Sequence, residues 1–160
     1  MNRTRIGVIY HSQSQGNTAA AAEHLARGLR ETTDLEVFLR NTYEEPVKPV
    51  VLADCAGVAF GTPDYFSYPA GALKVFMDDW LIAKRQGNDR IEDMPVALFM
   101  THGGGGAAKG PFEELFHHVG PQVGETISIE GRPDEDQAEA LRQLGAQLAE
   151  EAAGFAQEDS

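Results

Sequence analysis

Cysteine, cationic residues and long apolar runs are scarce in this sequence. The single cysteine, Cys55, excludes an intramolecular disulfide and any Cys-x-x-Cys redox pair. Thirteen lysines and arginines stand against 25 aspartates and glutamates, and the formal net charge of -12 disfavours nucleic acid and anionic membranes. The acidity either favours a basic protein partner or serves only to keep the protein soluble. No apolar run approaches the roughly 20 residues that span a bilayer. Because no signal-peptide pattern precedes the first apolar run either, we expect a cytoplasmic protein.

Patterns of metal and hydrolase sites are also missing. No set of cysteine, histidine and carboxylate residues has metal-ligand spacing, and His117 and His118 are expected to point in different directions on a helix. Neither Ser12 nor Ser14 lies in a Gly-x-Ser-x-Gly elbow. Cys55 precedes an apolar run and is expected to be a buried structural thiol. We therefore assign no catalytic side chain and no metal ligand.

Short apolar runs alternate with amphipathic segments along the chain. Strands are expected at 6–10, 35–39, 57–61, 96–100 and 123–129. Helices are expected at 18–31, from Pro69 to Trp80, from Pro111 to about 119 and from Asp134, where Gln137 completes a capping box, to a frayed tail at 157–160. Segment 41–54 is expected to be a loop with at most one short helix. This alternation predicts an α/β protein with a parallel sheet covered on both faces, in a single domain over residues 1–160.

The first expected strand runs into a loop of small hydroxyl, amide and glycine residues. These are Ser12, Gln13, Ser14, Gln15, Gly16, Asn17 and Thr18. A strand that ends in such a loop and then starts a helix directs backbone N–H groups and the helix dipole at one spot, so a phosphate can bind without lysine or arginine. A site that transfers phosphoryl groups needs a metal or a cationic clamp. The loop therefore indicates a phosphate that undergoes no chemistry, as in a nucleotide cofactor.

Two more loops of unusual composition follow the third and fourth expected strands. The first contains Thr62, Pro63, Asp64, Tyr65 and Phe66, and the second contains Thr101, His102, Gly103, Gly104, Gly105 and Gly106. Aromatic side chains in a loop either pack inward or cover a flat ligand. A glycine run suits either a close approach to a ligand or a flexible connection, and His102 either bonds a cofactor ring or caps its strand. Because the carboxyl ends of parallel strands meet at one edge, we expect the three loops to form one site.

Together these loops resemble those of the flavodoxin-like FMN proteins. The 12–18 loop is similar to the family's Ser/Thr-x-Thr-Gly-x-Thr phosphate loop, with Gln15 as an extra residue that leaves Ser12 and Ser14 both open as the first hydroxyl. Segments 61–66 and 70–78 resemble the second FMN loop and its helix, especially in the NAD(P)H:quinone oxidoreductases named for tryptophan-repressor binding. The 101–106 loop is similar to the third FMN loop, but it lacks the tyrosine that covers the flavin in many electron-transfer flavodoxins.

The resemblance implies a flavodoxin-like doubly wound three-layer sandwich with a five-stranded parallel sheet in the order 2-1-3-4-5. It implies non-covalent FMN, bound by residues 12–18, 62–66 and 101–106, with the chemistry on the flavin. The implied function is an oxidoreductase that passes electrons from NAD(P)H to a quinone, a flavin or a similar acceptor. Two alternatives stay open: an electron carrier that docks on basic proteins, and a cofactor-free binding module. Homo-oligomers are common among the quinone reductase relatives, and Trp80 suits either such an assembly or the core.

Overall fold

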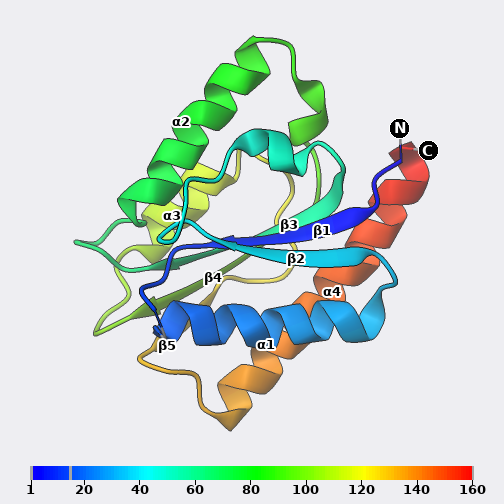
Figure 1. Cartoon of the computed structure of the whole chain (residues 1–160). Coiled ribbons are helices and arrows are strands. Elements are labelled where there is room, and N and C mark those ends of the chain that lie inside the picture. Colours follow the sequence, from blue (N-terminus) through cyan, green and yellow to red (C-terminus); the bar gives the residue numbers. More distant parts are fainter. Residues whose placement is uncertain (1, 15, 160) are drawn as a thin grey trace.

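The computed structural model describes residues 2–14 and 16–159, and its centre is a five-stranded parallel sheet in the order β2-β1-β3-β4-β5 (Figure 1). The strands are β1 Arg5–Tyr10, β2 Glu36–Asn41, β3 Cys55–Pro63, β4 Val96–His102 and β5 Ile127–Glu130. The helices are α1 Asn17–Thr32, α2 Gly71–Arg85, α3 Lys109–Phe116 and α4 Glu135–Asp159, with short 3-10 helices η1 Pro49–Leu52 and η2 Asp89–Ile91. The predicted fold and strand order are confirmed.

Helices cover both faces of the sheet, α1 and α4 on one face and α2 and α3 on the other (Figure 1). Along β3, Val58 and Phe60 pack with the α2 and α3 side chains, whereas Ala59 packs with those of α1 and α4. Successive side chains of a strand point to opposite faces, so a strand buried on both faces reads as a continuous apolar run. This explains why β3 was recognisable in the sequence despite its lack of alternation.

Two glycines let α1 and α4 lie in close contact. A Cβ atom at Gly28 would stand 1.9 Å from the Arg142 carbonyl oxygen, and one at Gly145 would stand 2.2 Å from the Leu25 carbonyl oxygen. No side chain fits at these separations. The long α4 helix is thereby held along α1, which starts at the edge of the sheet where the site lies.

Two predicted boundaries at the C-terminal end of the chain are wrong. Strand β5 begins at Ile127 rather than at 123, because Gly124 turns the chain with a φ of +64°. The expected fraying from Gln157 does not occur within the described residues, and α4 continues to Asp159. Its last carboxylate accepts hydrogen bonds from Arg3 Nε at 3.0 Å and Arg90 Nη2 at 3.2 Å, which ties the end of the helix to the start of the chain.

The middle of the chain differs in smaller ways from expectation. Helix α3 begins two residues before Pro111 and ends at Phe116, and α2 begins at Gly71 rather than at Pro69. Beyond the end of α3, the rings of His117 and His118 lie 4.1 Å apart, so the expected divergence of these side chains is wrong. The capping box of α4 is confirmed by reciprocal hydrogen bonds between Asp134 and Gln137. No helix in the described part of the chain is long and apolar enough to cross a membrane.

Candidate functional site

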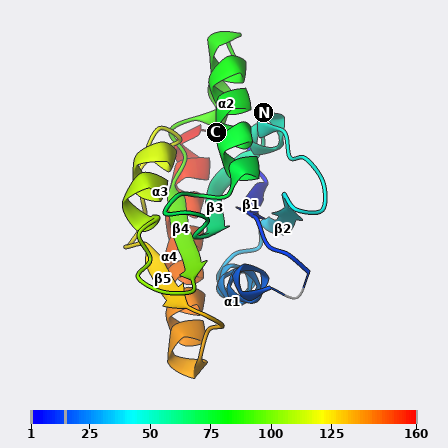
Figure 2. The same ribbon diagram turned by 90° about the vertical axis from the view of Figure 1, so that its left-hand side faces the viewer.

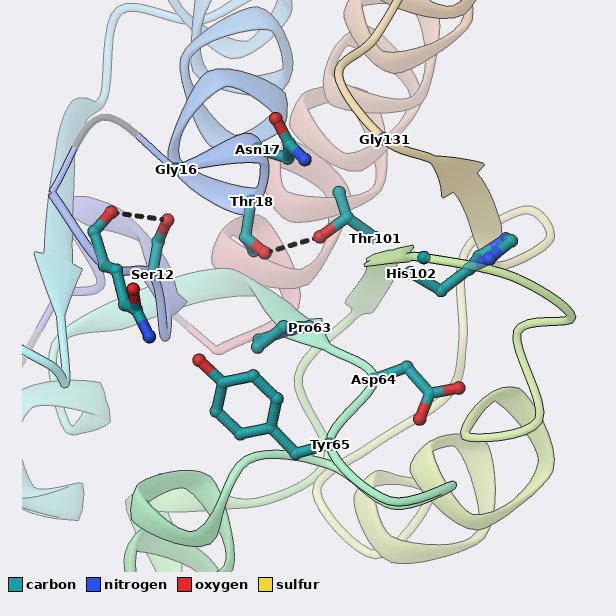
Figure 3. A pocket seen from close by; sticks show the side chains of 12 residues that line it. Ser12, Gly16, Asn17, Thr18, Pro63, Asp64, Tyr65, Thr101, His102 and Gly131 are labelled. Carbon is teal, nitrogen blue, oxygen red and sulfur yellow. Dashed lines mark hydrogen bonds between the residues drawn. The ribbon is translucent and has the colours of Figure 1, made fainter.

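A cavity of about 310 Å³ opens at the carboxyl ends of β1, β3 and β4. Figure 2 looks onto this edge of the sheet, and Figure 3 shows the cavity from close by. The lining residues are Ser12, Gln13, Gly16, Asn17, Thr18, Pro63, Asp64, Tyr65, Thr101, His102, Gly103 and Gly131. The structure therefore brings all three predicted loops into one site.

Asn41, at the end of β2, holds the start of the first loop in place. Its Oδ1 accepts the Ser12 backbone N–H at 2.9 Å, and its Nδ2 donates to the Ser12 carbonyl oxygen at 2.7 Å. Sequence reasoning missed Asn41, because the residue belongs to the neighbouring strand and its role depends on the β1–β2 pairing. The β1–β2 pairing sets Asn41 opposite Tyr10, the last residue of β1. This register was the only indication that Asn41 lies beside the first loop.

The Ser12 hydroxyl is already engaged by the protein. It accepts the Ala19 backbone N–H at 3.0 Å. It donates to the Gln13 carbonyl oxygen at 3.1 Å (Figure 3). Ser12 is only 3% exposed, whereas Ser14 is exposed and lies outside the cavity lining. The hydroxyl of Ser12 thus supports the first turn of α1, and Gln15 lies outside the described residues.

The amino end of α1 points free backbone donors at the cavity. The N–H groups of Asn17 and Thr18 have no hydrogen-bond partner among the residues that the structure describes. Gly16, the N-cap, supplies no side-chain cap, and no acidic residue lies in the first helical turn. Unpaired N–H groups and the positive end of the helix dipole together favour an anion at this point.

Buried threonines join the first loop to the end of β4. The Thr18 and Thr101 hydroxyl oxygens lie 2.7 Å apart, and both side chains are almost fully buried (Figure 3). Thr62, also predicted to bind the ligand, is fully buried and lies outside the cavity lining. Its hydroxyl accepts the Ala70 backbone N–H at 2.9 Å and donates to the Pro63 carbonyl oxygen, so it supports the start of α2.

Asp64 accepts two backbone hydrogen bonds that hold the aromatic loop in place. Asp64 Oδ1 accepts the Ser67 N–H at 2.8 Å, and Oδ2 accepts the Ala108 N–H at 3.1 Å, which connects this loop to the glycine loop. Tyr65 lines the cavity with its ring edge-on to His11 at 5.8 Å. Phe66, by contrast, is fully exposed and lies outside the cavity lining. Only one of the two predicted aromatic ligand contacts is therefore matched by the geometry.

Of the four consecutive glycines, only Gly103 lines the cavity. A Cβ atom at Gly103 would meet nothing within 4 Å, so the space above it is open. Gly105 and Gly106 have φ values of +81° and +64°, and a Cβ atom at Gly106 would touch the His102 ring at 3.1 Å. Gly104 also lies outside the lining. Gly105 and Gly106 thus turn the loop and let it pass the histidine, a role that composition alone did not separate from ligand contact.

One carboxylate, Asp64, and one imidazole, His102, are among the lining residues. Both Asp64 oxygens accept backbone N–H groups, and His102 Nδ1 is buried without a partner among the described residues. At the rim, burial lowers the pKa of His11, whose Nδ1 lies 2.9 Å from Thr42 Oγ1. The described part of the chain holds no group of three or more residues able to bind a metal ion. The site thus offers backbone donors, hydroxyls and one aromatic ring.

Sequence reasoning also missed Gly131, which lines the cavity just after β5. Its N–H donates to the His102 carbonyl oxygen at 2.9 Å, and its φ is +72°. The one available signal was its place at the carboxyl end of the last strand, beside the fourth. Cys55 is buried as predicted, outside the site, and burial raises the pKa of its thiol to about 12.

Comparison with solved structures agrees with this geometry. The chain is similar to a flavodoxin from the domain Archaea, with a TM-score of 0.79 and 23% identity over 93% of this chain and 99% of that one. It is similar to a flavodiiron protein from Giardia intestinalis (TM-score 0.81, 18% identity, 99% of this chain and 38% of that one). It also matches a flavone reductase (TM-score 0.75, 14% identity, 93% and 63%). No protein-family model and no curated protein matches the sequence. The chain has the flavodoxin-like fold.

Proposed function

We propose that the protein binds FMN non-covalently and acts in electron transfer. The observation that carries this proposal is that the N–H groups of Asn17 and Thr18 have no partner among the described residues. Both residues line a cavity whose lining includes neither lysine nor arginine. These donors, with Gly16, would hold the phosphate. Because the fold resembles that of flavodoxins, we propose FMN as the ligand that carries this phosphate.

The rest of the cavity suits the flavin ring. Tyr65 would lie against the ring on one side, and the open space above Gly103 would receive it on the other. His102 Nδ1, which has no partner in the described part of the chain, is a polar atom that a ring heteroatom or a water molecule can satisfy. The volume of 310 Å³ is at the lower end for ligand pockets. A cavity of this volume suits a flavin whose ring remains partly exposed to solvent.

FMN supplies the redox chemistry when bound, and the protein supplies binding and electrostatics. The N–H groups at the start of α1 stabilise a charged phosphate that does not react. Asp64 holds two loops at a fixed separation through its bonds to Ser67 and Ala108. Since both of its oxygens are bonded, this carboxylate acts as a brace, and no proton transfer by it is needed.

The first candidate for the use of the flavin is an oxidoreductase that takes hydride from NAD(P)H and reduces a quinone, a flavin or a similar planar acceptor. Its support is the exposure of Tyr65 and Tyr68 beside the cavity, by 38% and 40% of their surfaces, since such rings offer a planar acceptor a stacking surface. The second candidate is a carrier that docks on basic redox proteins. Its support is the match to an archaeal flavodoxin over nearly the whole of both chains and the net charge of -12.

Two measurements test the proposal in sequence. After excess FMN is added and unbound ligand removed, the protein should retain the visible absorbance of a flavin. A protein that stays colourless would refute FMN binding and favour the cofactor-free module. For the loaded protein, steady-state oxidation of NAD(P)H with a quinone distinguishes the two uses, because turnover supports the oxidoreductase and its absence supports the carrier.

A further inference from the structure

The exposed large apolar side chains belong to one segment of the chain, whose β2–β3 connection and α2 lie on the same side of the sheet (Figure 1). Among the described residues, the large apolar side chains that are exposed by 38% or more all lie between Tyr43 and Ile82. They are Tyr43, Val50, Tyr65, Phe66, Tyr68, Val75, Leu81 and Ile82, from the β2–β3 connection, the aromatic loop and α2. Single exposed apolar residues are ordinary, but a concentrated set marks an interaction surface. The sequence allowed Trp80 to serve either in an assembly or in the core, and the structure buries it in the core.

Phe66 projects from this surface on a strained turn. Tyr65 and Tyr68 exchange backbone hydrogen bonds of 3.0 and 3.2 Å, and the two residues between them have φ values of +57° for Phe66 and +64° for Ser67. A bulky residue in the left-handed region costs free energy and persists only where its surroundings hold it. The Asp64 carboxylate bonds to the Ser67 N–H and holds the turn in this form. The fold thus keeps a fully exposed phenyl ring pointing outward.

A groove on the same side is of a size to receive such a ring. Its volume is about 190 Å³, and its walls include Val47, Ala72, Val75 and Phe76, with Lys48 and Asp79 paired at 3.2 Å beside them. An apolar cavity of roughly 150 Å³ accommodates benzene in another protein. Phe66 does not fill the groove of its own chain, because its side chain is fully exposed.

We propose that the occupant is a second copy of this chain, with Phe66 of each protomer seated in the groove of the other. A two-fold axis repeats the same contact twice, so a protruding ring and a groove on the same chain are the elements that an isologous interface needs. The pairing does not depend on the cofactor. It goes beyond the proposed electron transfer, since it concerns the groove beside α2 and a protein partner, and both the groove and Phe66 lie outside the cavity lining.

The distribution of charge favours a like partner over a basic one. Residues 43–85 contain four cations and six anions, a net charge of -2, whereas α4 contains one cation and seven anions, a net charge of -6 out of -12 for the chain. On α2 and beside it, Lys48 pairs with Asp79, Lys74 with Asp78 and Lys84 with Glu92. Two copies of this nearly neutral face meet without strong repulsion, and a basic protein would instead favour the acidic α4 side.

The test measures the mass of the protein by sedimentation over a dilution series, with and without FMN. Wild type should form dimers. Phe66→Gly removes the ring and suits the left-handed backbone, so it should weaken the dimer without unfolding the protein. Val75→Glu blocks the groove. The homodimer of either variant lacks both Phe66–groove contacts. Since the loss of one central aromatic contact raises a dissociation constant about 30-fold, the loss of both should raise it roughly 1,000-fold.

Leu81→Glu is the matched control, because Leu81 is an exposed α2 residue that does not line the groove and lies about 120° around the helix from Val75, and the change adds the same charge. It should dimerise like wild type. Mixing Phe66→Gly with Val75→Glu restores one intact contact, so the mixture should form heterodimers about 30-fold tighter than either variant alone. A wild type that stays monomeric at every concentration, variants that dimerise like wild type, or a mixture without heterodimers would overturn the proposal. None of these results bears on flavin binding, which the absorbance measures separately.

Discussion

Gly16→Ala is the substitution that most directly probes the construction of the first loop. A Cβ atom at this position would lie 2.5 Å from Ser12 Oγ and 2.8 Å from the Gln13 carbonyl oxygen, so both must move. The first accepts the Ala19 N–H at 3.0 Å, and the second accepts the Gly16 N–H at 2.8 Å. Weakening two hydrogen bonds costs about 1 kcal/mol each. A glycine-to-alanine change recovers about 0.5 kcal/mol from the unfolded chain.

The expected result is a loss of about 1 to 2 kcal/mol in the free energy of unfolding, measured by urea denaturation. FMN should bind about tenfold more weakly in a fluorescence titration, because the same shift displaces the loop that holds the phosphate. Gly71→Ala is the matched control, since a Cβ atom there meets nothing within 4 Å at the start of α2, and its stability should equal or slightly exceed that of wild type. A Gly16→Ala protein with wild-type stability and wild-type affinity for FMN would refute this account of the loop.

Three further predictions follow from other parts of the molecule. Gly103→Ala should leave the stability of the FMN-free protein unchanged, because its Cβ atom meets open space, but should weaken FMN binding about tenfold in the same titration; equal affinity would show that the ring lies elsewhere. Since burial raises the pKa of the Cys55 thiol to about 12, the thiol should react with a maleimide only after denaturation, as mass spectrometry would detect. Burial alone would raise the pKa of Asp159, but the charges and hydrogen bonds of Arg3 and Arg90 hold it below its ordinary value. The lowered pKa stabilises the fold above the ordinary aspartate pKa and loses that contribution as the pH falls through the folded value. Asp159→Asn should therefore be less stable than wild type at neutral pH, with a difference that disappears in acid unfolding curves.

The fold could be predicted because its signals are local. Apolar runs and helical spacing depend on neighbours along the chain, and β3 read as a buried strand because both of its faces are covered. The errors arose where a distant contact decides. Asp159 ends an ordered helix only because Arg3, at the other end of the sequence, contacts it. The late start of β5 has a local cause instead, because Gly124 turns the chain there through its own backbone conformation.

The three loops of the site could be located from the sequence, but not the direction of each side chain within them. Thr62 and Phe66 lie in the correct loop, yet one is buried under α2 and the other points into solvent. Asn41 braces the first loop from a neighbouring strand, and nothing in its local sequence indicates that contact. Composition therefore predicts where a site lies, whereas the partners of each polar atom depend on the assembled fold.

The affinity of the protein for FMN, compared with that for riboflavin, is the most direct test of the central claim. The two ligands share the ring and differ in the phosphate, which the N–H groups of Asn17 and Thr18 are proposed to hold. Two charge-assisted hydrogen bonds of about 1.5 kcal/mol each correspond to a difference of about 100-fold. We predict that FMN binds with one molecule per chain and at least about 100-fold more tightly than riboflavin in a fluorescence-quenching titration. Equal affinities, or no binding of either ligand, would contradict the account.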